Sequence, residues 1–260
     1  MKSSNIRSSK SLKHLMSEQL RKCLFTALAA TLLLALTTVA SFGANPGVLP
    51  IGSQPFGMSY GQWAVAWWQW ALSIPAANSP MLDTTGAFAA VGQRGPVWFL
   101  GGSLGNSVER TLTVPAGKAI FAPVHPWIFG ATVGDCTPSA PGVPCDVPTL
   151  RASAAYAATN AQILEVSIDS DPVRTVRKYR ALSPSAFNVT LPDGNILGLP
   201  AGIYGPQVAD GYWLMLQPLD DGRHTIRMHV VNPTAGSDYT IIYHVTVNGG
   251  DGDDESQTND

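Results

Sequence analysis

The chain has 260 residues, of which 45% are hydrophobic and 13% charged, and its formal net charge at pH 7 is −2. This composition excludes a highly charged disordered protein, because enough apolar residues are present to form a packed core. The sequence contains no basic patch beyond its N-terminal segment, so we expect no nucleic-acid partner. A chain of this length can bury one good core, and a single domain is therefore expected.

The N-terminal segment has the features of an export signal. Residues 1–23 carry six basic residues and one acid, and residues 24–40, LFTALAATLLLALTTVA, carry no charge. This pattern predicts a secretory signal peptide over 1–40, cleaved after Ala40 or alternatively after Ala44. The alternative is an uncleaved membrane anchor, since the apolar run is at the short limit for a spanning helix. This anchor would be the only expected membrane contact. In either case the rest of the chain is predicted to be secreted or periplasmic.

Residues 41–58 are rich in Gly, Pro and Ser and predict an extended N-terminal arm. The sequence YGQWAVAWWQWALSIP, residues 60–75, then predicts a helix over 59–74. Ser59 can cap its start, and Gln62, three residues later, completes a capping box. Pro75 ends the helix, because the residue before a proline disfavours the helical conformation.

Four tryptophans lie within eight residues of this helix. At about 100° per residue, Trp63, Trp67 and Trp70 fall on one stripe, which we interpret as core packing. Trp68 lies off this stripe. It is the candidate ligand-binding residue, because an indole near the surface can stack on a sugar ring or another planar ligand.

From residue 96 onward the chain consists of short β-prone runs separated by turn residues. They are PVWFL, RTLTV, AIFAPV, ILEVSI, VRKYRAL, AFNVTL, YWLMLQPL, HTIRMHVV and YTIIYHVTV. An Ala-rich stretch over 149–164 predicts one further short helix. The pattern favours a mainly β fold, an antiparallel β-sandwich of jelly-roll type, in a single domain over 59–249. Alternating apolar residues in the last two runs predict a hairpin with one buried face.

Two further segments carry predictions of their own. Cys136 and Cys145 bracket the loop CTPSAPGVPC and are predicted to form a disulfide, because they lie close together in an exported chain. A metal or redox pair is the alternative, but it lacks the CxxC spacing and a neighbouring histidine. Residues 250–260 are acidic and have no apolar side chain, which predicts a disordered tail.

The sequence GGSLG, residues 101–105, formally matches the G-x-S-x-G motif of serine hydrolases. In that motif a strand, a tight turn and a helix force the serine outward. Here a β-prone run follows Ser103 instead of a helix, so we interpret the segment as a glycine-rich hairpin loop. If Ser103 were a nucleophile, Asp210 and His224 would follow it in the required chain order.

The histidines and aspartates form no clear site pattern. His229 and His244 are predicted on the same outer face of the last hairpin, but no third ligand lies at a fixed spacing, so no metal site is expected. His125 lies among prolines beside Trp127, where it can line a pocket or make structural hydrogen bonds. The aspartates at 169 and 171 and at 220 and 221 adjoin Pro and Gly, which predicts turns rather than the facing carboxylates of a glycosidase.

Several motifs, in order along the chain, resemble a family of uncharacterised secreted bacterial proteins. They are YGQWAVAWWQWALSIP, NSPMLDTTG, QRGPVWFLGG, RTLTVPAGKAIFAPV, LGLPAGIYGPQVADGYWLML and GRHTI…YHVTV. The resemblance covers most of residues 58–247, and the tryptophan segment together with GPVWFL and ADGYW makes it specific. It implies an exported domain with a β-sandwich fold, and it implies no activity and no catalytic residues.

Two functional hypotheses follow from the sequence. The first is a non-catalytic extracellular binding or structural module with a glycan or protein ligand, which the sandwich prediction and the abundant aromatic residues favour. The second is a secreted hydrolase whose site is assembled from loops, with Ser103, His125, Asp210 and Tyr212 as candidates. Such an enzyme requires a pocket that holds at least two of these side chains within hydrogen-bond reach. No cofactor is predicted for either.

Overall fold

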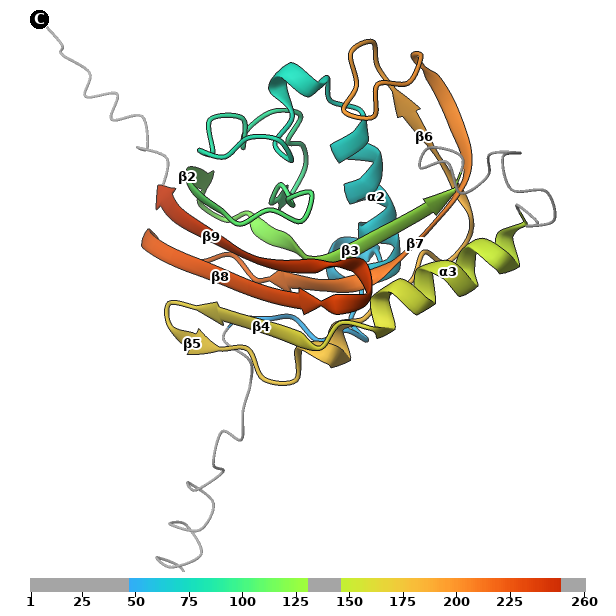
Figure 1. Cartoon of the computed structure of the whole chain (residues 1–260). Coiled ribbons are helices and arrows are strands. Elements are labelled where there is room, and N and C mark those ends of the chain that lie inside the picture. The colour runs from blue at the N-terminus through green and yellow to red at the C-terminus, as the bar shows by residue number, and fades with distance from the viewer. Residues whose placement is uncertain (1–46, 131–145, 249–260) are drawn as a thin grey trace, which may run out of the picture. The chain divides into compact units, whose positions relative to one another are not determined.

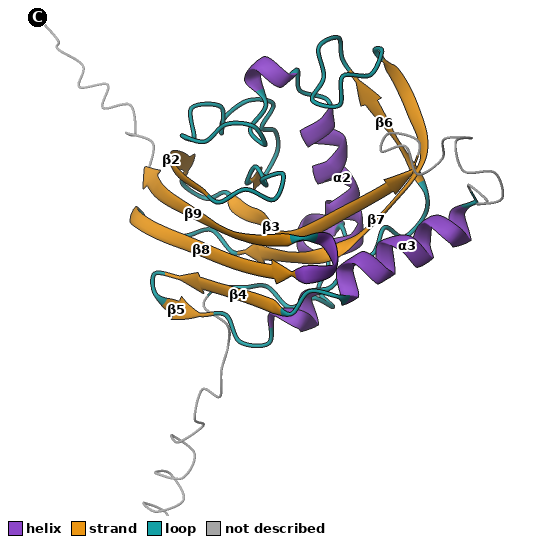
Figure 2. Cartoon of the chain, in the orientation of Figure 1, coloured by secondary structure: helices purple, strands orange, loops and turns teal. Residues whose placement is uncertain are grey.

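The computed structural model describes residues 47–130 and 146–248, which belong to one compact unit. The predicted signal peptide (1–40), the Cys136–Cys145 pair and the predicted acidic tail (250–260) lie outside the described residues. The fold is mainly β, as the sequence predicts, with the tryptophan-rich helix and one further helix (Figure 2). Neither of these two helices is long and apolar enough to cross a membrane.

Within residues 47–130 and 146–248, the regular structure consists of two α-helices and nine strands, with four short 3-10 turns between them. The helices are α2 (Tyr60–Leu72) and α3 (Val147–Thr159). The strands are β1 (Val97–Phe99), β2 (Val108–Pro115), β3 (Ala119–Gly130), β4 (Ile163–Ile168), β5 (Asp171–Pro172), β6 (Phe187–Leu191), β7 (Gly202–Leu216), β8 (Gly222–Asn232) and β9 (Ser237–Asn248). The 3-10 turns are η1 (Pro55–Gly57), η2 (Ala76–Asn78), η3 (Val176–Tyr179) and η4 (Pro233–Ala235).

The strands form two sheets, one with the order β1-β3-β7-β6 and the other with the order β2-β9-β8-β4-β5 (Figure 1). Both sheets are mixed, which corrects the prediction of an antiparallel sandwich, because β1 pairs with β3 and β2 pairs with β9 in parallel. The cause is the path of the chain. It leaves the first sheet after β1, forms β2 in the second sheet and returns as β3 beside β1, and a strand that returns by a crossover runs parallel to its neighbour.

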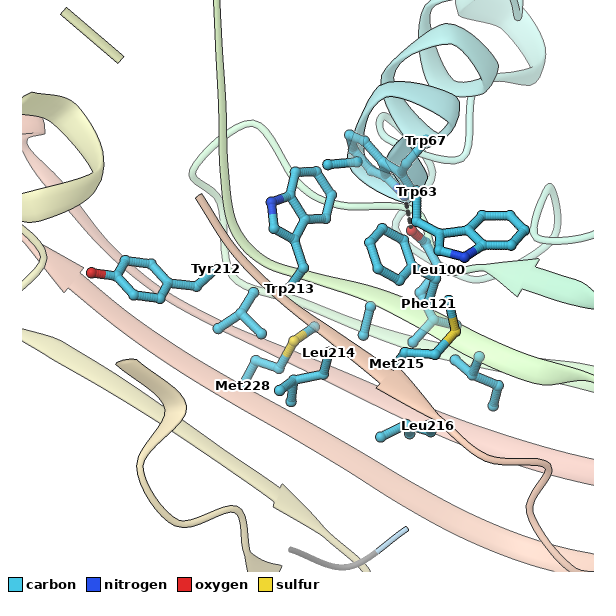
Figure 3. Packing of buried hydrophobic residues seen from close by; sticks show 14 of the residues in the cluster. Trp63, Trp67, Leu100, Phe121, Tyr212, Trp213, Leu214, Met215, Leu216 and Met228 are labelled. Carbon is cyan, nitrogen blue, oxygen red and sulfur yellow. Dashed lines mark hydrogen bonds between the residues drawn. The ribbon is translucent and has the colours of Figure 1, made fainter. Parts of the chain in front are cut away.

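The last two strands confirm the predicted hairpin. Ile226 is paired with Tyr243 and Met228 with Ile241, and all four side chains are buried. The buried residues of both sheets and of α2 form one continuous hydrophobic cluster, part of which Figure 3 shows. Alternation with a period of two residues therefore places one face of β8 and β9 in the core, as a half-buried strand requires.

Helix α2 begins as the sequence predicts. The Ser59 hydroxyl accepts a hydrogen bond from the Gln62 backbone N–H, and the Gln62 side chain accepts one from the Ser59 N–H (2.8 Å). The predicted stripe is in the core, with Trp63, Trp67 and Trp70 all buried. The helix contacts β6 and β7, so that its tryptophans pack against the first sheet.

Two segments differ from the sequence predictions. The run 176–182 was expected to form a strand, but it contains η3, in which Val176 and Tyr179 are buried at the spacing of one 3-10 turn. The loop 101–105 joins β1 to β2 in the other sheet, so it is not a hairpin loop. The described part of the N-terminal arm lies along β7, since Val48 bridges Leu216.

Candidate functional site

Three of the four tryptophans of α2 donate their indole N–H groups to backbone carbonyls. The bonds are Trp63 to Pro55 (2.9 Å), Trp67 to Leu100 (2.8 Å) and Trp70 to Val91 (3.0 Å). The second of these is drawn in Figure 3. Each bond ties the helix to a different loop, and each satisfies a polar group that burial removes from water. These side chains are fully accounted for by packing.

Trp68 has different surroundings. It is 7% exposed and contacts Trp67 edge to face, with ring centroids 4.9 Å apart. Its Nε1 atom is shielded from solvent and has no hydrogen-bond partner among the described residues. Trp98 and Trp213 also have indole N–H groups without a partner in the described part of the chain, but neither lines the pocket described next.

A pocket of about 290 Å³ adjoins Trp68, and we call it the Trp68 pocket. Its walls come from α2, the loop after β1, the middle of β3 and the start of β9. The lining residues are Trp68, Met81, Ser103, Leu104, Gly105, His125, Pro126, Trp127, Ile128, Ser237 and Tyr239. The pocket thus brings together three residues that the sequence singled out separately, namely Trp68, Ser103 and His125.

The loop that carries Ser103 is fixed at its base. Arg110, which is 3% exposed, donates to the carbonyl oxygens of Gly101 and Gly102, and the Tyr243 hydroxyl also donates to Gly101 (2.6 Å). The Ser103 hydroxyl, by contrast, is shielded and has no partner among the described residues. The base of the loop is therefore held in place, while its serine hydroxyl is unsatisfied.

His125 is held by hydrogen bonds on both ring nitrogens. Its Nε2 atom lies 2.9 Å from Trp127 Nε1 and 3.1 Å from Asn232 Nδ2, which are both donors. Its Nδ1 atom lies 3.1 Å from the Tyr239 hydroxyl, which in turn donates to the Val124 carbonyl (3.3 Å). Since Nε2 must accept, Nδ1 carries the proton and donates it to Tyr239, which defines a neutral tautomer.

The orientation of Asn232 supports this assignment. Its Nδ2 atom also donates to the Ala157 carbonyl (2.9 Å), and its Oδ1 atom accepts from the Ala235 N–H (3.2 Å), so the amide cannot be turned over without losing both bonds. Burial lowers the pKa of His125 to about 4, in agreement with a neutral ring at neutral pH. Both nitrogens are committed to structural partners, and His125 is not placed to take a proton from Ser103.

Asp210 and Tyr212 are buried outside the pocket. The Asp210 carboxylate accepts two hydrogen bonds from Arg180, at 2.9 Å from Nε and 2.7 Å from Nη2, and is 1% exposed. This bidentate ion pair holds the Asp210 carboxylate. Among the described residues, no two of the side chains of Ser103, His125, Asp210 and Tyr212 are hydrogen-bonded to each other. The arrangement that the hydrolase hypothesis requires is thus not formed.

The histidines of β8 and β9 pair with acids across the strands. His224 lies 2.6 Å from Asp169, and His244 lies 2.6 Å from Glu109. Burial lowers the pKa of His224, but its bonds to the Asp169 carboxylate and the Asp220 carbonyl outweigh this and raise it overall. Within 47–130 and 146–248, no group of three His, Cys, Asp or Glu residues is arranged to hold a metal ion.

Sequence reasoning missed two contributors to the site. Arg110 falls on the same side of β2 as the buried Leu112 and Val114, and this inward position of a charged residue was a signal that strand alternation offered. Asn232, at the end of β8, contacts His125 across more than a hundred residues of chain. No local sequence pattern predicts a contact between residues so far apart in the chain.

Comparison with known proteins gives little further information. No family model and no curated protein matches the chain. Among solved structures, the chain is similar to one described as "Structure of PbICP-C in complex with falcipain-2", with 13% identity and a TM-score of 0.23 over 59% of this chain and all of the other. A TM-score this low does not establish a shared fold.

Proposed function

We propose that this chain is an exported, non-catalytic binding module that holds one ring of a neutral extracellular glycan in the Trp68 pocket. The observation that carries the proposal is the pairing of two unsatisfied polar groups in one hollow. The Trp68 indole N–H and the Ser103 hydroxyl are both shielded, both lack a partner among the described residues, and both belong to residues that line the pocket.

The walls of the pocket favour a ring-shaped ligand. Trp68, Trp127 and Tyr239 contribute aromatic surface, and Met81 and Ile128 contribute aliphatic surface. Ligand sites of this size are mostly apolar with a few placed polar groups that fix the orientation of the ligand. A sugar ring has apolar C–H faces and hydroxyl groups at its edge, which matches an aromatic wall with isolated hydrogen-bonding groups.

The unsatisfied groups supply a reason for binding. A buried donor without a partner costs about 1–3 kcal/mol, and a ligand oxygen that reaches the Trp68 N–H recovers much of this. Because both polar atoms are shielded, a ligand reaches them after an outward shift of the loop tip. Leu104, at the tip, is 54% exposed, and the glycine that follows it has open space beside it.

The secreted hydrolase is the alternative, and the geometry gives it less support. Among the described residues, Ser103 has no base within hydrogen-bond reach, and both nitrogens of His125 bind structural partners. Nucleophilic catalysis by a serine needs a base that accepts its proton. A binding role needs no such base.

The test is a titration of the purified protein with neutral oligosaccharides, followed by intrinsic fluorescence and by calorimetry. We expect saturable binding to at least one neutral glycan, weakened about tenfold in Trp68→Phe, which keeps an aromatic ring but removes the N–H. Trp98→Phe is the matched control, because it also removes a buried indole N–H without a partner, but outside the pocket. Absence of binding across the panel, or equal binding by Trp68→Phe, would overturn the proposal.

A further inference from the structure

The Trp68 pocket is lined by uncharged side chains. Its lining contains no Lys, Arg, Asp or Glu, and its one titratable imidazole, His125, is neutral because two donors occupy Nε2. A charged sugar would bring its charge into this hollow without a counter-charge, and burial of an unpaired charge is strongly unfavourable. Uronic acids, sulfated sugars and free amino sugars therefore fit the pocket poorly.

The two unsatisfied groups have different hydrogen-bonding capacities. The indole N–H of Trp68 only donates, whereas the Ser103 hydroxyl both donates and accepts. A ligand that satisfies both must offer an acceptor to Trp68 and, in its simplest form, a donor to Ser103. A sugar hydroxyl offers both on one oxygen, and a secondary amide offers them on its carbonyl oxygen and its N–H, so the rest of the lining decides between a hydroxyl and an acetamido group.

The aliphatic part of the lining matches the rest of such a group. Met81 and Ile128 are buried and line the same pocket, and their side chains can make no hydrogen bond with a sugar hydroxyl. A hydroxyl placed there would lose its water partners without replacement, whereas a methyl group would gain apolar contact. The acetyl methyl of an acetamido group fits this surface.

We infer that the preferred ligand of the Trp68 pocket is an N-acetylated amino sugar. The inference rests on the proposed function, since it names the sugar class that the same pocket takes. The acetamido carbonyl accepts from the Trp68 N–H, the amide N–H donates to the Ser103 hydroxyl, and the methyl group contacts Met81 and Ile128.

Three trisaccharides with the same β-1,4 linkage provide the test. N-acetylglucosamine, glucose and glucosamine trimers differ at carbon 2 of each ring, which carries an acetamido group, a hydroxyl or an amine. Calorimetry at neutral pH should give the lowest Kd for the acetylated trimer. The other two should bind at least about tenfold more weakly, as expected for loss of one hydrogen bond to a buried group.

Two variants separate the roles of the unsatisfied groups. Ser103→Ala should weaken binding of the acetylated trimer, because it removes the oxygen that accepts the acetamido N–H. Trp68→Phe should weaken binding of the acetylated trimer by about tenfold. Trp98→Phe should leave both Kd values unchanged, and circular dichroism verifies that each variant is folded.

The possible outcomes distinguish the inference from the function on which it rests. Binding of the glucose trimer as tightly as the acetylated one overturns the choice of an N-acetylated sugar but leaves a glycan-binding pocket. Tighter binding of the glucosamine trimer overturns the neutral-ligand argument. The proposed function itself fails if no sugar binds, or if Trp68→Phe binds every sugar as tightly as the wild type does.

Discussion

Helix α2 presents its tryptophans to two different surroundings. On one side, Trp63, Trp67 and Trp70 each donate an N–H to a backbone carbonyl and pack against the first sheet. On the other side, Trp68 is buried to a similar degree but adjoins a hollow and has no acceptor. Burial alone therefore does not separate a packing tryptophan from one that lines a site. The partner of the N–H and the space beside the ring separate them.

Arg110 fixes the base of the loop that carries Ser103, and replacing Arg110 should lower the free energy of unfolding more than the other substitutions do. Arg110→Met leaves the carbonyl oxygens of Asp83 and Gly102 without their buried donor, whereas the Gly101 carbonyl keeps its bond from the Tyr243 hydroxyl. We expect the free energy of unfolding to fall by about 3 kcal/mol or more, because each unsatisfied buried group costs about 1–3 kcal/mol. Urea unfolding followed by fluorescence measures the loss.

The control for this variant is Arg223→Met, because Arg223 is exposed on β8. A substitution of that kind usually changes stability by no more than about 0.5 kcal/mol. If Arg110→Met were as stable as this control, the segment 100–102 would not depend on the buried guanidinium.

His125 should make the pocket side of the molecule sensitive to acid. Its pKa is about 4 in the folded protein and 6.5 ordinarily, so the unfolded chain takes up a proton first as the pH falls. Stability from this group is therefore complete above pH 6.5 and is lost progressively down to pH 4. The difference between these two pKa values corresponds to roughly 3.5 kcal/mol.

Urea unfolding of the wild type and of His125→Asn, repeated between pH 7.5 and 4, isolates this contribution. The wild type should lose more stability than the variant across that interval, because the variant has no imidazole to protonate. His244→Asn, on the outer face, should keep the wild-type difference. Parallel pH profiles for wild type and His125→Asn would contradict the neutral, doubly bonded histidine.

The comparison of the two sides is sharpest in a pair of conservative substitutions. Trp67→Phe removes a hydrogen bond and leaves the Leu100 carbonyl without that donor, whereas Trp68→Phe removes an N–H that has no partner. We expect Trp67→Phe to cost about 1–2 kcal/mol more than Trp68→Phe in the absence of ligand. Equal losses would mean that the two indoles have the same structural role.

Local signals in the sequence predicted the parts of the fold that depend on neighbouring residues. The capping box at Ser59 and Gln62 and the alternation along β8 and β9 are of this kind, and both are confirmed. The parallel pairing of β1 was not predictable in the same way. The sequence of a three-residue strand does not indicate which strand it pairs with. The partner of β1 is determined by where the chain returns after β2.

The site was predictable only in pieces. Trp68, Ser103 and His125 were each singled out by the sequence, but nothing in their spacing showed that they line one pocket. The sequence alone does not show which tryptophans of α2 have a hydrogen-bond acceptor. The acceptors of three of them lie in loops at other positions of the chain. The hydrolase candidates do not form one site, and the sequence could not show this for a related reason. Asp210 forms an ion pair with Arg180, and only folding brings these two residues together.

Two serine substitutions give the smallest expected effects and test whether an unsatisfied group behaves differently from a satisfied one. Ser183 is buried, and its hydroxyl accepts a hydrogen bond from the Ala209 N–H (3.1 Å), so Ser183→Ala should cost about 1 kcal/mol. The Ser103 hydroxyl has no such bond among the described residues, and Ser103→Ala should not lower the stability of the free protein, because it removes a shielded polar group without a partner. Urea unfolding of both variants measures the difference. A loss in Ser103→Ala as large as that in Ser183→Ala would mean that this hydroxyl already has a partner in solution. The ligand would then have to displace that partner, and the gain expected from satisfying Ser103 would disappear.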